Sequence, residues 1–181
     1  QNFLANAIRY TEQGGVMLGF QRRGDSVRIS VTDRCNIRCF YCMPELEAEF
    51  VPRDRLLTFE EITRFCRVAV QLGVRRVRLT GGEPLVRNQL VRLIAMLREL
   101  DGLDDLALTT NGLLLADHAA GLRNAGLDRL NVSLDALSET SFRKIARRDG
   151  LHKVIKGIEA ARAVGFPKIR LNTVAVRGIT E

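Results

Sequence analysis

Short β-branched segments alternate with helical patterns along most of this chain, and this alternation restricts the fold more than any other feature. Five segments are predicted to be strands, at 27–32, 74–80, 106–110, 129–134 and 169–176. Strands that alternate with helices in this way form a parallel sheet, either curled toward a (β/α) barrel or doubly wound. We therefore expect an α/β fold, with a partial parallel (β/α) barrel as the first interpretation.

The predicted strands are too few for a closed barrel. A complete eight-stranded (β/α) barrel needs about 250 residues, whereas this chain has 181 and stops soon after its fifth predicted strand. We expect a barrel that is truncated after about five strands.

One helix has a clear start and a clear end in the sequence. Thr58 and Glu61 form a capping-box pattern, and Gly73 follows the last apolar position. The apolar positions at helical spacing between them are Ile62, Phe65, Ala69 and Leu72. Asn88 is the expected cap of the next helix.

Polar clusters follow four of the predicted strands, at 33–42, 80–84, 109–112 and 133–135. In both kinds of parallel sheet, ligands bind at the carboxyl ends of the strands. Because polar residues follow four different predicted strands, we interpret these four strand ends as one binding site.

Composition narrows the function classes. The chain has no apolar run near the length of a membrane span, and its net charge of +7 is scattered, with 6% aromatics and no Trp. These features disfavour a membrane protein and a nucleic-acid-binding protein, whereas a polyphosphate ligand fits the charge. We expect a cytoplasmic location.

Three of the four cysteines lie within eight residues, with the spacing C-x₃-C-x₂-C: Cys35, Cys39 and Cys42. In a reducing compartment such a cluster more often binds metal than forms disulfides. Three thiolates on a four-iron cluster leave one iron open to a small molecule. The alternatives are a zinc site, for which the two histidines lie too far away, and ordinary buried cysteines. Cys66 lies alone on the apolar side of its helix and is interpreted as core.

This cysteine loop, with Tyr41 directly before the last cysteine, resembles the signature of the radical-SAM superfamily. The resemblance implies a [4Fe–4S] cluster held by the three cysteines. It also implies that the open iron binds the amino and carboxylate groups of S-adenosyl-L-methionine (SAM). An electron from the reduced cluster would then cleave SAM to a 5′-deoxyadenosyl radical.

Five longer strings, in register, resemble the family of GTP 3′,8-cyclases of molybdenum-cofactor biosynthesis. They are RISVTDRCNIRCFYCMP (28–44), VRLTGGEPLVR (77–87), LTTNG (108–112), LNVSLD (130–135) and RLNTV (170–174). The resemblance covers residues 27–181 and implies a lyase that converts GTP to 3′,8-cyclo-7,8-dihydro-GTP. Two alternatives stay open: another radical-SAM enzyme that acts on a peptide or protein, and a non-catalytic metal-binding fragment.

The resemblance also assigns site residues. Expected SAM contacts are Tyr41 through its backbone, Gly82 in the GGEP turn, Glu83 as acceptor from the SAM amino group, and Ser133. Expected GTP contacts are Arg28, Arg78, Thr109 and Arg170, the last of which stands where the family usually has lysine. No catalytic residue is expected beyond the cluster and SAM. Taken singly, each residue also has a purely structural interpretation. Arg28 and Arg78 fit solvated strand residues, Ser133 and Thr109 fit helix caps, and Gly82 fits a turn.

Further expectations come from the same resemblance. A second [4Fe–4S] cluster is expected only in the part of the family's chain that lies beyond residue 181, where it would anchor the guanine. The 181 residues alone are therefore expected not to complete the cyclisation. An electron donor such as flavodoxin or ferredoxin is implied, and a homodimer is allowed.

Residues 1–26 have a sequence pattern that differs from that of the remaining chain. QNFLANAIRYTEQGG resembles the N-box helix of histidine-kinase ATP-binding domains, where the residue matching Asn6 would hold Mg²⁺, and the following residues resemble the next hairpin of that fold. The glycine-rich boxes of those domains are absent. Two other interpretations are a helix plus hairpin packed on the main domain, and a foreign segment joined near 27–33. We therefore divide the chain into an extra N-terminal segment, 1–26, and an incomplete radical-SAM core, 27–181.

Overall fold

The computed structural model describes residues 20–43 and 50–180. It contains one six-stranded sheet in the order β1-β2-β3-β4-β5-β6. The strands are β1 (Phe20–Arg23), β2 (Ser26–Ser30), β3 (Arg76–Thr80), β4 (Asp105–Thr110), β5 (Arg129–Ser133) and β6 (Ile169–Asn172). The α-helices are α2 (Phe59–Gln71), α3 (Leu90–Arg98), α4 (Leu115–Asn124), α5 (Glu139–Ala146) and α6 (Leu151–Ala163), with short 3₁₀ helices η1 (Arg53–Arg55) and η2 (Pro84–Val86).

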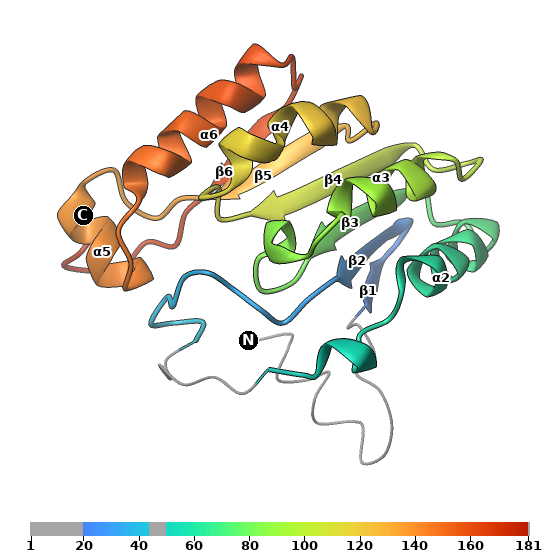
Figure 1. Ribbon diagram of the computed structural model, residues 1–181, viewed down its shortest axis with the longest axis horizontal. Helices are drawn as coiled ribbons and strands as arrows, with labels where there is room; N and C mark the ends of the chain where they lie inside the picture. Colours follow the sequence, from blue (N-terminus) through green and yellow to red (C-terminus); the bar gives the residue numbers. More distant parts are fainter. Residues whose placement is uncertain (1–19, 44–49, 181) are drawn as a thin grey trace.

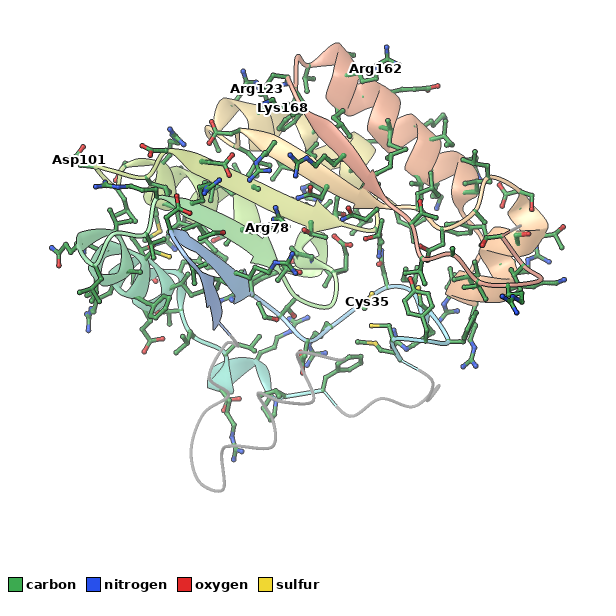
Figure 2. The ribbon with its side chains drawn as sticks, turned by 180° about the vertical axis from the view of Figure 1, so that it is seen from behind. Cys35, Arg78, Asp101, Arg123, Arg162 and Lys168 are labelled. Carbon is green, nitrogen blue, oxygen red and sulfur yellow. The ribbon has the colours of Figure 1, made fainter. Side chains whose placement is uncertain are left out.

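Strands β2 to β6 are parallel and lie side by side in chain order. Right-handed crossovers between neighbours in such an order place every connecting helix on the same face of the sheet. Figure 1 shows α2, α3, α4 and α6 on one face, while Figure 2 shows the other face without a helix layer. A doubly wound sheet would carry helices on both faces. The prediction of a partial barrel with five parallel strands is confirmed.

Each strand divides its side chains between the two faces. In β2, Val27 and Ile29 are buried, whereas Arg28 between them is only half-buried. The same alternation in β3 buries Val77 and places Arg78 opposite Arg28 on the uncovered face. The apolar core therefore lies between the sheet and the helices, and the uncovered face is free to be polar.

Helix α2 begins with the predicted capping box. The Thr58 hydroxyl accepts from the Glu61 N–H at 3.2 Å, and the Glu61 carboxylate accepts from the Thr58 N–H at 2.7 Å. Gly73, at φ +90°, follows the helix end as expected. Leu72, which continues the apolar spacing, is the residue at the end cap of the helix and is 67% exposed. The residues of α2 that are buried are Phe59, Ile62, Thr63, Cys66 and Val70.

Replacing Thr58 with alanine should lower the free energy of unfolding by about 1 kcal/mol, because the first turn of α2 loses its side-chain acceptor. Urea unfolding measures this loss. The control is Arg67→Ala on the exposed side of the same helix, which should change stability by less than about 0.5 kcal/mol. Equal losses in the two variants would contradict the capping role.

The prediction that Asn88 caps α3 is wrong. Gln89 is the residue at that cap, its backbone is left-handed (φ 60°), and it makes no side-chain capping hydrogen bond.

The start of the described chain is an antiparallel hairpin, in which Phe20 lies opposite Ile29 and Arg23 opposite Ser26. Since β2 begins at Ser26, this hairpin crosses the boundary drawn between 26 and 27. The expected N-terminal helix, with Asn6, lies outside the described residues. Across the part of the chain that the structure describes, no helix combines the length and the apolar character of a membrane span.

Candidate functional site

The cysteine loop leaves the carboxyl end of β2 and runs along the edge of the sheet, where Figure 2 shows Cys35. Its backbone is held by the last turn of α5. The N–H of Arg38 donates to the Ala146 carbonyl at 2.9 Å, and that of Phe40 donates to the Ile145 carbonyl at 3.2 Å. These two carbonyls lie at a helix end, where they lack partners within the helix, so the loop completes α5 while α5 fixes the loop.

The GGEP turn after β3 packs directly against this loop, as predicted. The Gly82 N–H donates to the Thr32 carbonyl and the Glu83 N–H to the Arg34 carbonyl, both at 2.7 Å. A β-carbon on Gly82 would lie 2.3 Å from the Arg34 carbonyl oxygen. A β-carbon on Gly81 would lie equally close to the Thr32 carbonyl oxygen. Glycine is therefore required at both positions by contact between two backbone segments.

Glu83 of this turn is fully buried, with 0% of its surface exposed. One carboxylate oxygen accepts from the Leu85 N–H at 3.0 Å and from the Thr110 hydroxyl at 2.7 Å. The other accepts from the Asn111 N–H at 2.6 Å. Burial raises the pKa of Glu83, and these three hydrogen bonds oppose the rise. The expected contact of Glu83 with the SAM amino group stays a prediction, and the structure shows that three donors of the protein already fix the orientation of this carboxylate.

Asn111, at the carboxyl end of β4, connects that strand to the cysteine loop. Its amide oxygen accepts from the Leu113 N–H at 3.1 Å. Its amide nitrogen donates to the Asn36 side-chain oxygen at 2.7 Å and to the Cys35 sulfur at 3.9 Å. The sequence marked this position only as the end of a strand, so the contact with Cys35 was not predicted.

Tyr41 connects the loop to the end of β5. Its hydroxyl donates to Asp135 at 2.5 Å, and the other oxygen of Asp135 accepts from the Val174 N–H at 2.9 Å. Burial, followed by this hydrogen bond, raises the pKa of Tyr41. Ser133, the last residue of β5, lies half-buried on the uncovered face near this connection. Asp135 was visible in the sequence as part of a polar strand end, yet its partner was not.

The three loop cysteines are half-buried, and burial raises the pKa of each thiol, that of Cys39 to about 12. Nearby Asp135 and Cys35 raise the pKa of Cys39 further. Among the described residues, no three His, Cys, Asp or Glu side chains converge on a single-ion site. This donor set still fits a four-iron cluster, because the cluster takes each thiolate on a different iron. Cys66 is fully buried in the core, as predicted.

The expected GTP residues lie on the uncovered face. Arg28 lies opposite Arg78 on adjacent strands, and Thr109 lies opposite Asn131, which in turn lies opposite Arg170. Figure 2 shows Arg78 on this face. Burial lowers the pKa of Arg78, and the positive charges of three nearby arginines lower it further. These three are Arg28, Arg129 and Arg170.

Two further residues of this face were not predicted. Arg129 donates from its Nε to Asp105 at 2.6 Å and also pairs with it through Nη2. Asn131 is 2% exposed, and its amide nitrogen has no hydrogen-bond partner among the described residues. Both follow from the alternation of RLNVS in β5, which places them on the same face as Arg170.

A hollow of about 430 Å³ lies at the amino ends of the strands, opposite the cysteine loop. Its lining residues are Arg76, Asp104, Asp105, Asp128, Arg129, Pro167, Lys168 and Arg170. The charges of this lining nearly balance, because three aspartates accompany the four basic residues.

Residues 29–181 match the family model described as the Radical SAM superfamily. The chain belongs to the radical SAM superfamily. Proteins of this superfamily use a [4Fe–4S] cluster and SAM, in accordance with the expectation from the cysteine loop.

Two curated relatives of this radical SAM chain have the same name. A GTP 3′,8-cyclase of Rhodopirellula baltica is 63% identical over 163 residues, which are 90% of this chain and 45% of the relative. Another from Ectopseudomonas mendocina is 53% identical over 88% of this chain and 48% of the relative. The chain thus spans about half the length of the curated relatives that it matches.

Solved structures confirm the radical SAM fold. Streptococcus suis SuiB, in a structure described as bound to S-adenosylmethionine, superposes with a TM-score of 0.70 at 22% identity. That match covers 83% of this chain and 34% of SuiB. Methylornithine synthase superposes with a TM-score of 0.65 at 20% identity, over 85% of this chain and 45% of the enzyme.

Proposed function

We propose that this chain is the cluster-bearing part of a GTP 3′,8-cyclase, which converts GTP to 3′,8-cyclo-7,8-dihydro-GTP in molybdenum-cofactor biosynthesis. Membership of the radical SAM superfamily and the identity to curated cyclases support this proposal. The observation that carries it is the juxtaposition of a three-cysteine loop with an arginine-lined sheet face.

The cluster ligands in this proposal are Cys35, Cys39 and Cys42. When bound, the cluster and SAM would supply the one-electron reduction and the 5′-deoxyadenosyl radical, which is chemistry that no side chain provides. The chain's own contribution is to fix the loop, to leave one iron without a protein ligand and to surround SAM. The residues that we propose to surround it come from three different strand ends and are Tyr41, Gly82, Glu83 and Ser133.

The GTP contacts in this proposal are Arg28, Arg78, Thr109 and Arg170. Guanidinium groups form paired, charge-assisted hydrogen bonds with phosphate oxygens. Four arginines on this face repel one another, as the lowered pKa of Arg78 indicates. They are Arg28, Arg78, Arg129 and Arg170. A bound triphosphate would neutralise that repulsion. Arg170 keeps the positive charge of the lysine that is usual in the family, and its 4-residue strand places it on the same face.

A radical SAM enzyme that modifies a peptide is the competing interpretation, since the superfamily shares the fold. A clustered cationic face recognises a compact polyanion better than it recognises a peptide chain. The arginine face therefore favours GTP.

The test is GTP binding by the anaerobically reconstituted chain, measured by calorimetry. Arg78→Gln removes a charged donor from the face and should weaken binding about tenfold to a hundredfold. The matched control is Arg162→Gln on α6, which is well separated from Arg78 in Figure 2 and should bind GTP like the unaltered chain. Equal binding of GTP by the two variants would count against the arginine face as the GTP site.

We also propose a cytoplasmic location, a low-potential electron donor of the flavodoxin or ferredoxin type, and a homodimer as the assembly to examine. The cluster requires reduction, and the reducing cytoplasm keeps its thiol ligands available. Size-exclusion chromatography with light scattering would measure the assembly.

A further inference from the structure

We propose that Asn111 is a positioning residue that donates a hydrogen bond to the Cys35 sulfur and thereby raises the reduction potential of the cluster. The proposal rests on the proposed assignment of Cys35 as a cluster ligand. It adds a residue from the end of β4 that acts on the cluster through this cysteine. Its basis is the 3.9 Å contact between the Asn111 amide nitrogen and the Cys35 sulfur.

The orientation of the Asn111 amide is fixed by its neighbours. A backbone N–H can only donate, so the amide atom that faces the Leu113 N–H must be the oxygen. The nitrogen is then directed at the cysteine loop. Of its two hydrogens, one has the Asn36 oxygen as partner at 2.7 Å, which leaves the other for Cys35.

The backbone of Asn111 is fixed as well. Its N–H donates to the buried Glu83 carboxylate at 2.6 Å, and the neighbouring Thr110 hydroxyl donates to the same carboxylate at 2.7 Å. Glu83 is in turn tied to the cysteine loop through its own N–H, which donates to the Arg34 carbonyl. The backbone segments that carry the amide and the sulfur are therefore joined by one set of hydrogen bonds through Glu83.

A donor at this sulfur has a predictable electrostatic effect. Reduction adds negative charge to the cluster and its thiolates, and an N–H directed at a thiolate stabilises the reduced form more than the oxidised form. Removing the donor should therefore lower the potential. At a fixed ambient potential, we expect the ratio of reduced to oxidised cluster to fall roughly threefold to tenfold, where tenfold corresponds to about 59 mV for one electron.

The experiment is a mediated redox titration of the reconstituted chain, followed by electron paramagnetic resonance, with iron content measured on each sample. Asn111→Leu removes the donor at similar volume. Asn111→Asp keeps the acceptor for Leu113 and serves if the leucine variant fails to fold. Asn131→Leu is the matched control, because it makes the same change at a buried strand position of the same sheet. Asn36→Ala removes the other partner of the amide and leaves the donor to Cys35 in place.

The proposal expects a lower potential in both Asn111 variants and an unchanged potential in Asn131→Leu and Asn36→Ala. An equal fall in Asn36→Ala would show that loop position, rather than donation to sulfur, sets the potential, and would overturn it. An unaltered potential in the Asn111 variants, with full iron content, would also overturn it and leave the proposed function intact. Failure of the unaltered chain to assemble a cluster would instead contradict the proposed function.

Discussion

Replacing Cys39 with alanine is expected to remove nearly all cluster-bound iron from the anaerobically reconstituted chain. Two remaining thiolates cannot hold three irons of a [4Fe–4S] cluster. Cys39 is also the residue whose carbonyl accepts from the N–H groups of Cys42 and Met43, at 2.9 and 2.8 Å. That turn is made by backbone and should survive the substitution. Iron and acid-labile sulfide analysis, together with the visible absorption of the cluster, measures the loss.

Cys66→Ala is the matched control for this prediction. Cys66 is fully buried in α2 and packs in the core, so its removal should cost on the order of 1 kcal/mol of stability while the iron content stays unchanged. Iron retained by Cys39→Ala, or lost from Cys66→Ala, would show that the ligand set is wrong.

The second large effect is expected at Gly82. An alanine β-carbon there would lie 2.3 Å from the Arg34 carbonyl oxygen and 2.6 Å from the Asp33 carbonyl oxygen, and these are backbone atoms that no rotamer change can move. The GGEP turn and the cysteine loop must then separate, which would weaken the hydrogen bond from the Gly82 N–H to the Thr32 carbonyl. We expect a loss of roughly 3 kcal/mol in the free energy of unfolding, together with reduced iron content.

Gly121→Ala tests whether any glycine-to-alanine change has this effect. Gly121 lies inside α4, and a β-carbon there would meet only Val91, at an ordinary 3.4 Å. Alanine favours a helix interior by up to about 1 kcal/mol relative to glycine. Urea unfolding should therefore show equal or higher stability for Gly121→Ala. A similar loss in both variants would refute the close-packing explanation for Gly82.

The parts of the fold that depend on local sequence were predictable. The strands follow from short runs of apolar and β-branched residues, and the α2 cap follows from two side chains three residues apart. The remaining features of the fold depend on more than the local sequence pattern. Gln89 adopts a left-handed backbone that no local pattern indicated, and Leu72, the cap residue after α2, is exposed although it continues the apolar spacing.

The candidate site shows the same division. The sequence placed the cysteine loop and the GGEP turn together because both follow neighbouring parallel strands, and the structure confirms this. The burial of Glu83 could not be predicted, since its three donors come from the GGEP segment itself and from the end of β4. The contacts of Asn111 with Cys35 and of Asp135 with Tyr41 likewise join positions 76 and 94 residues apart.

The alternation of side chains in the sheet has a consequence for how such a protein diversifies. Side chains on the helix-covered face, such as Val77 and Leu108, maintain the packing against the helices. Side chains on the uncovered face, such as Arg78 and Thr109, face the site. Successive side chains of a strand point to opposite faces of the sheet, so we expect that side chains of the uncovered face can be exchanged with little cost in stability. Evolution or protein engineering can therefore change the substrate of this fold through the uncovered face, while the residues packed against the helices stay the same.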